Sequence, residues 1–133
     1  MKTTISSVIF LMLSICVSAQ KNQEVNSVSS GASIAWSSST TYDFGNINKG
    51  TPVTAAFEFT NNGSEPLIIS EAKGSCGCTS VEYPQQPVPP GAKDSVKATF
   101  NPSSIGAFNK AVKVTANISS KTVILNIKGQ VVE

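Results

Sequence analysis

The sequence predicts an all-β protein, in which about seven short strands form a sandwich of two antiparallel sheets. Beyond residue 19 the chain contains 11 Val, 8 Ile and 9 Thr but only 2 Leu, and β-branched side chains favour strands over helices. No stretch of twelve or more residues repeats apolar side chains at helical spacing. Four segments instead alternate apolar and polar residues, which is typical of antiparallel strands with one buried face.

The first 19 of the 133 residues are predicted to be a secretory signal peptide. Lys2 supplies a positive charge, residues 5–17 form an apolar run, and Ala19 ends a small-residue cleavage site. The run is shorter than the roughly 20 residues of a membrane-spanning helix, so we expect a soluble exported protein, periplasmic or extracellular. Cys16 raises lipid anchoring as an alternative, although Ile15 before it is larger than a lipidation motif allows.

Residues 20–39 are predicted to be a flexible linker before a domain at residues 40–133. Residues 20–33 are rich in Ser, Asn and Gln and show no period. A short strand at residues 34–36 is expected to fix this arm to the domain. Cleavage after Ala19 leaves 114 residues with two cysteines and a net charge of +1.

Apolar side chains that share one face predict four strands. They are Val53, Ala55, Phe57 and Phe59; Val96, Ala98 and Phe100; Val112, Val114 and Ala116; and Val123, Leu125 and Ile127. Residues 79–83 are expected to form a further strand. Another is expected at Leu67-Ile68-Ile69, which is apolar on both faces and is therefore predicted to be central in its sheet.

Turn-forming residues separate these segments. Residues 61–66 (NNGSEP) predict a hairpin turn, residues 101–106 predict another turn, and residues 117–120 are expected to join the last two strands. The proline-rich residues 84–91 cannot donate hydrogen bonds to a ladder and are expected to connect the two sheets. About seven short strands in roughly 100 residues is the count of an immunoglobulin-like sandwich.

The order of several motifs resembles a known family. The motifs are Tyr42-Asp43-Phe44-Gly45, Phe57-Glu58-Phe59-Thr60-Asn61-Asn62-Gly63, Pro66-Leu67-Ile68-Ile69, Ser75-Cys76-Gly77-Cys78-Thr79, Pro89-Pro90-Gly91, Phe100-Asn101-Pro102 and Ile127-Lys128-Gly129. In this order they resemble the bacterial domain-of-unknown-function family 1573, over about residues 40–132. The resemblance implies an exported immunoglobulin-like domain, similar to those of major sperm protein and of cilium- and centrosome-associated proteins. It implies no activity.

The composition excludes several classes of function. The chain contains no His and no Arg, so it has no Ser-His-Asp or Cys-His catalytic unit, no imidazole ligand and no bidentate guanidinium. A net charge of +2 is too small for a nucleic-acid-binding surface. The carboxylates follow no motif spacing, and Asp43 is interpreted as a turn acceptor for backbone amides. We therefore expect neither an enzyme nor a cofactor. We interpret Trp36, Tyr42 and Tyr83 as packing residues, with a patch that stacks on a carbohydrate or peptide as the alternative.

Cys76-Gly77-Cys78 is the motif with distinctive chemistry. Residues i and i+2 of an extended chain lie roughly 6.5–7 Å apart, at the upper limit of disulfide reach, and Gly77 allows the backbone to shorten this gap. Four interpretations stay open: a structural disulfide or buried thiol pair, an easily reduced redox pair, a Cu(I) site, and simple packing. Zinc is disfavoured because it needs four ligands.

These observations predict a non-enzymatic interaction or structural module of the bacterial cell envelope. The alternative is a thiol-redox or Cu(I)-handling protein that acts through Cys76 and Cys78. The expected partner is another envelope protein, bound through an exposed strand edge or the loops at one end of the sandwich. No transmembrane segment is expected after signal cleavage. The Cys76–Cys78 loop together with residues 84–91 is the predicted functional end.

Overall fold

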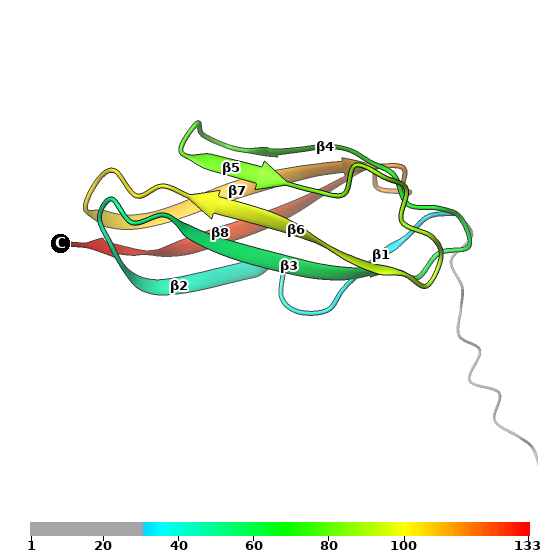
Figure 1. The fold of residues 1–133 in the computed structure, drawn as a ribbon, viewed down its shortest axis with the longest axis horizontal. Coiled ribbons are helices and arrows are strands. Elements are labelled where there is room, and N and C mark those ends of the chain that lie inside the picture. The colour runs from blue at the N-terminus through cyan, green and yellow to red at the C-terminus, as the bar shows by residue number, and fades with distance from the viewer. Residues whose placement is uncertain (1–30) are drawn as a thin grey trace, which may run out of the picture.

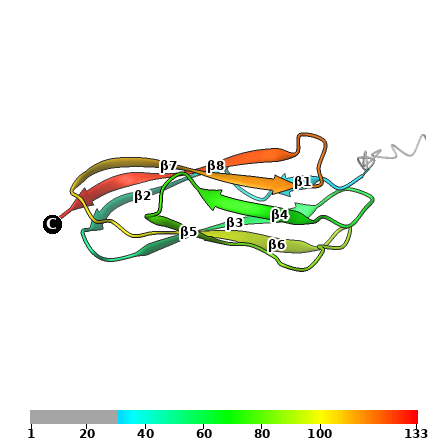
Figure 2. The ribbon, with the colours of Figure 1, turned by 90° about the horizontal axis from the view of Figure 1, so that it is seen from above.

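Residues 31–133 are described by a computed structural model, and they form two four-stranded sheets packed face to face. The strands run along the long axis of the sandwich (Figure 1), and a view from above separates the two layers (Figure 2). Within this range no helix is long and apolar enough to cross a membrane. The predicted signal peptide, Cys16 and linker residues 20–30 lie outside the described residues.

Eight strands follow one another along residues 31–133. They are β1 (Ile34–Trp36), β2 (Thr41–Asn48), β3 (Val53–Asn61), β4 (Ile69–Gly74), β5 (Thr79–Glu82), β6 (Lys93–Phe100), β7 (Gly106–Ala116) and β8 (Thr122–Val132). The first sheet has the order β1-β3-β6-β5 and the second β2-β8-β7-β4. The predicted all-β sandwich is confirmed, with eight strands where about seven were expected.

The four alternating segments become β3, β6, β7 and β8, which are the inner strands of the two sheets. In these four segments, every side chain predicted to face inward is buried except Val53 and Val123. These two residues are half-buried, because they lie at or next to the first residue of their strands. An inner strand packs one face against the opposite sheet over its whole length, so its alternation is regular. This is why these four strands are readable from the sequence.

β2 pairs with β8 in parallel, so the second sheet is mixed rather than purely antiparallel as predicted. β1 pairs with β3 in the first sheet, and the chain then moves to the second sheet as β2. β1 and β2 run in the same direction, because both run opposite to β3 (Figure 1). Residue alternation specifies a buried face but not the direction of a neighbouring strand, so the parallel pair was not predictable from it.

The prediction of a central strand at Leu67-Ile68-Ile69 is wrong, because β4 begins at Ile69 and lies at the edge of its sheet. Leu67 and Ile69 are buried, whereas Ile68 is 49% exposed. Leu67 precedes the strand and forms an isolated bridge with Val88 in the proline-rich stretch. The run of three apolar residues therefore combines a buried bridge residue, an exposed residue and the buried start of an edge strand.

Two connections also differ from the predictions. Residues 61–66 do not form a hairpin, because β3 and β4 belong to different sheets. The proline-rich residues 84–91 do not connect the two sheets, because β5 and β6 are antiparallel neighbours in one sheet. Proline has no N–H to donate, so this segment does not continue the ladder between β5 and β6. It covers the end of the sandwich, where Val88 and Leu67 exchange two backbone hydrogen bonds of 2.8 Å.

Candidate functional site

The Cys76-Gly77-Cys78 turn joins β4 to β5, which are edge strands of the two sheets (Figure 1). The structure joins the two sulfurs in a disulfide, with an S–S distance of 2.00 Å and a Cα–Cα distance of 5.3 Å. Both cysteines are half-buried. Gly74 at the end of β4 allows a close approach, since a Cβ there would lie 2.8 Å from the backbone oxygen of Thr79. The disulfide therefore closes a tight crossing between the two sheets.

The two cysteines have different surroundings. The Cys76 sulfur lies 3.8 Å from the hydroxyl of Thr79, a residue that is 7% exposed. Cys78 instead lines a hollow of about 190 Å³ together with Ile105, Phe108 and Lys110. Ile105 is 53% exposed, so the hollow has an apolar rim on its solvent side. Cys78 therefore lies beside a hollow that solvent can enter, whereas the Cys76 sulfur lies beside the Thr79 hydroxyl.

The predicted functional end is wrong, because the cysteine turn and the proline-rich residues 84–91 lie at opposite ends of the sandwich (Figure 1). Cys78 precedes β5, and residues 84–91 follow it. The cysteine turn instead lies beside the connection between β6 and β7, where the amide N–H of Asn101 donates to the carbonyl oxygen of Cys78 at 2.9 Å. These two segments cannot form one surface.

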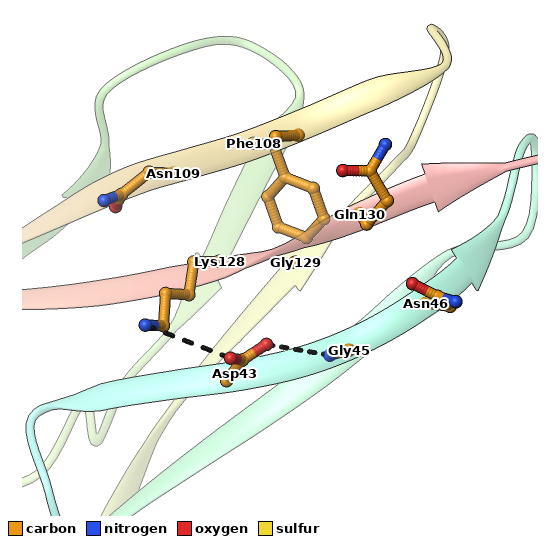
Figure 3. Close-up of a pocket in the computed structure, with 9 residues that line it drawn as sticks. Asp43, Gly45, Asn46, Phe108, Asn109, Lys128, Gly129 and Gln130 are labelled. Carbon is orange, nitrogen blue, oxygen red and sulfur yellow. Dashed lines mark hydrogen bonds and ion pairs between the residues drawn. The ribbon is translucent and has the colours of Figure 1, made fainter.

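A second feature is a polar hollow on the sheet formed by β2, β8 and β7. Figure 3 shows Asp43, Asn46, Asn109, Lys128 and Gln130 around it, and its volume is about 430 Å³. These side chains are exposed. No local sequence pattern marks this hollow, because its lining residues come from three separate strands.

Gly45 and Gly129 explain why the chain can form the bulge of β2 at this hollow. Asp43 accepts a hydrogen bond of 2.9 Å from the N–H of Gly45, which confirms its predicted role as a turn acceptor. Gly45 has a φ of 66°, a backbone conformation that favours glycine. A Cβ on Gly129 would lie 2.8 Å from the carbonyl oxygen of Gly45 and 2.9 Å from the Phe108 ring. The Lys128–Asp43 ion pair is 3.9 Å long and both side chains are about half exposed, so it stabilises the bulge little.

The predicted packing role of the three aromatic residues matches their positions. Trp36 packs edge-on against Phe59, with ring centroids 5.5 Å apart. Tyr42 contacts Phe44 at 4.8 Å and Phe57 at 6.5 Å. Tyr83 follows β5 at the other edge of the first sheet and packs against the core. The three side chains therefore do not gather into one stacking surface.

Metal-ligating side chains do not cluster in residues 31–133, where no group of three or more His, Cys, Asp and Glu could hold an ion. In the same range every buried side-chain nitrogen and oxygen has a hydrogen-bond partner. The described part of the chain thus offers sheet edges, open hollows and one disulfide.

The open sheet edges differ in how they are protected against pairing with another strand. β2 and β4 each contain a register shift and carry charges, β1 has three residues, and β5 has four. β1 covers only the last three residues of β3, Phe59 to Asn61. Residues 53–57 of β3 (VTAAF) have no charge and no bulge, and in the described chain they pair on one side only, with β6. This edge lacks the usual protecting devices.

The match to a protein family covers nearly all of the described residues. The model of a family described as "Protein of unknown function (DUF1573)" matches residues 34–131. A protein of unknown function from Porphyromonas gingivalis W83 has a similar structure, with a TM-score of 0.65 and 15% identity over 83% of this chain and 51% of that chain. No curated protein matches the sequence.

Two further solved structures share the fold. One is the ASH / PapD-like domain 7 of human CEP192, with a TM-score of 0.59 and 13% identity over 99% of this chain and 98% of that domain. The other is the secreted serine protease VesC from Vibrio cholerae, with a TM-score of 0.54 and 14% identity over 76% of this chain and 23% of VesC. The chain spans about half of the Porphyromonas protein and about a quarter of VesC. At these identities the similarity shows the fold alone.

Proposed function

Because the chain belongs to the family described as "Protein of unknown function (DUF1573)", which assigns no activity, we propose a function from the geometry of the domain. The protein is an exported, non-enzymatic module of the bacterial cell envelope, in the periplasm or outside the cell. It binds an extended segment of a partner protein as an added strand along the open edge of β3. The observation that carries this proposal is the unprotected edge at residues 53–57.

Hydrogen-bond directions along β3 identify the groups that a partner would use. The carbonyl oxygen of Glu58 accepts from Ser37 on the β1 side at 2.9 Å, whereas the N–H of Asn61 donates to Ala92 on the β6 side. Main-chain groups alternate in direction along an antiparallel strand. The N–H and C=O groups of Thr54 and Ala56 therefore point toward the open edge, where an added strand could pair with them.

The side chains next to this edge indicate what kind of segment fits. Thr54 and Ala56 are exposed, small and uncharged. On the inner face, Phe57 contacts Tyr42, which is 43% exposed. An extended partner segment with an apolar residue near Tyr42 and no charge opposite Thr54 and Ala56 matches this surface.

Replacing Ala56 by proline tests the edge. The change removes an N–H that no strand uses within the described residues, and it leaves the hydrogen bonds to β6 in place. We expect the partner adduct obtained by cross-linking in intact envelopes to fall by at least about tenfold, since main-chain pairing supplies the affinity in strand addition.

Val81→Pro is the matched control, because Val81 points its N–H toward the open side of β5 at the other edge of the same sheet. Thermal unfolding of both variants separates binding from misfolding. Equal loss of the adduct in both variants, or no loss in a folded Ala56→Pro protein, would contradict binding at β3.

Export is tested by the mass of the protein isolated from envelopes. We expect a mature chain that starts at Gln20 and carries no lipid, found in the fraction released without detergent. The matched variant Ala19→Arg should block cleavage and leave the full chain with the membranes. An uncleaved wild-type chain in the cytoplasmic fraction would contradict the proposed location.

A second candidate function, thiol-disulfide chemistry, is supported by the half-buried disulfide beside a hollow. Cu(I) handling, the other part of the sequence-based alternative, requires free thiolates, and the bonded pair offers none until it is reduced.

A further inference from the structure

We propose that the Cys76–Cys78 disulfide exchanges with a dithiol of a partner protein, with attack at Cys78 and Cys76 as the leaving sulfur. This inference rests on the second candidate function and is independent of strand binding at β3. It is supported by three observations: the disulfide joins residues only two positions apart, the two cysteines have different surroundings, and the hollow beside Cys78 is open to solvent.

The disulfide closes a ring between residues only two positions apart. The entropy that a disulfide removes from the unfolded chain grows with loop length, so this bond adds little stability. β4 is held by its ladder with β7, and β5 by its ladder with β6. The protein should therefore stay folded when the pair is reduced, as a redox cycle requires.

The hollow beside Cys78 provides the approach for an incoming thiol. Phe108 and the exposed Ile105 give it apolar walls, and Lys110 adds a positive charge. Apolar walls can hold the side chains that flank a partner's cysteine, and an ammonium group attracts a thiolate. Cys78, unlike Cys76, is among the residues that line this hollow, and it also packs against the core.

Thr79 gives the exchange its direction. Its hydroxyl lies 3.8 Å from the Cys76 sulfur, and Thr79 is itself 7% exposed. A hydroxyl that donates to a thiolate stabilises the charged form, so it favours Cys76 as the leaving group. The nearest carboxylate along β4, Glu71, lies on a different hollow with Lys73 and does not line the one beside Cys78.

The exchange proceeds in two balanced steps. A thiolate of the partner forms an S–S bond with Cys78, the Cys76–Cys78 bond breaks, and its electron pair leaves on Cys76. The partner's second thiolate then attacks the partner sulfur that is bonded to Cys78. That S–S bond breaks, and Cys78 leaves as a thiolate. The partner dithiol becomes a disulfide, the protein pair gains two electrons, and two protons pass from the partner's thiols to Cys76 and Cys78.

The test uses the mature chain with dithiothreitol as the dithiol, followed by rapid alkylation and intact-mass measurement. We expect complete reduction while the far-UV circular dichroism and the unfolding temperature stay essentially unchanged. A pair that stays oxidised in excess dithiothreitol, or a protein that unfolds on reduction, would overturn the proposal.

Single-cysteine variants test the direction. Cys76→Ser leaves Cys78 beside the hollow and should form a mixed disulfide with oxidised glutathione about tenfold faster than Cys78→Ser, provided that both are folded. Thr79→Val should slow reduction of the wild-type pair several-fold, whereas Thr99→Val on β6, whose hydroxyl bonds Thr54, should not change it. Equal rates in the two cysteine variants would contradict attack at Cys78.

The Ala56→Pro variant separates this inference from the proposed function. It should exchange with dithiothreitol at the wild-type rate while it loses the cross-linked partner. Failure of exchange in every variant would overturn the redox inference and leave strand binding at β3 intact.

Discussion

Replacing Asn61 by alanine is expected to lower the free energy of unfolding by about 3 kcal/mol, because it leaves buried backbone groups without partners. The Asn61 side chain is fully buried. Its amide nitrogen donates to the carbonyl oxygens of Glu65 at 2.8 Å and Val88 at 2.9 Å, and its oxygen accepts from the N–H of Gly63 at 3.0 Å. One side chain at the end of β3 thus joins the turn at residues 62–66 to the proline-rich residues 84–91, and urea unfolding measures its contribution.

Two variants make the result specific. Asn62→Ala changes the exposed neighbouring asparagine and should shift stability by less than about 0.5 kcal/mol. Asn61→Asp keeps the shape but cannot donate to the carbonyl oxygens while ionised, so it should be at least as destabilising as Asn61→Ala at neutral pH. Equal stability of Asn61→Ala and Asn62→Ala would show that the buried amide contributes nothing.

Replacing Phe57 by alanine is expected to destabilise the domain by about 3–5 kcal/mol, the usual result of removing a large buried aromatic side chain. Phe57 is 2% exposed and lies in the middle of β3, where it packs edge-on against Tyr42. Typical domains are stable by only about 5–15 kcal/mol, so this change approaches the whole margin. Chemical denaturation at 25 °C gives the value.

Phe57→Leu retains most of the buried volume and should be clearly less destabilising than Phe57→Ala. Glu58→Ala changes the exposed side chain next to it and should leave stability within about 0.5 kcal/mol. A Phe57→Ala protein as stable as the Glu58→Ala protein would mean that β3 does not form the centre of the core.

The strands that bury one face along their whole length could be predicted from the sequence. β3, β6, β7 and β8 are inner strands, and the packing of two sheets imposes strict alternation on them. Edge strands carry weaker patterns, because only part of their length packs on the core. β2 alternates poorly around its bulge at Gly45, and β4 has buried residues only at its start.

The connections were predicted less well than the strands. The turn residues 61–66 mark a reversal but not the sheet to which the chain returns. Asn61 continues the inward face of β3 beyond Phe59 and is buried, whereas Asn62 is exposed. The partners that the Asn61 side chain binds include Val88, which is distant in sequence, so they could not be predicted from the alternation. Pairing between Leu67 and Val88 is likewise a contact between segments distant in sequence.

The cysteine pair could be singled out from residue chemistry alone, but its surroundings could not. Cys78 meets Ile105 and Phe108 only because the connection from β6 to β7 lies beside the connection from β4 to β5. Thr79, by contrast, follows Cys78 directly in the sequence. Its position beside the Cys76 sulfur depends on the tight turn that Gly74 permits.

The parallel pairing of β2 with β8 has a mechanical consequence. The start of β2 and the end of β8 lie at opposite ends of their shared ladder, which extends from the Thr41–Asn126 pair to the Asn48–Val132 pair. Tension applied between these two points acts along the strands, so it loads the hydrogen bonds of the ladder together in shear. A hairpin pulled from its open end would instead break its bonds one at a time. This domain is therefore built to resist stretching along its long axis.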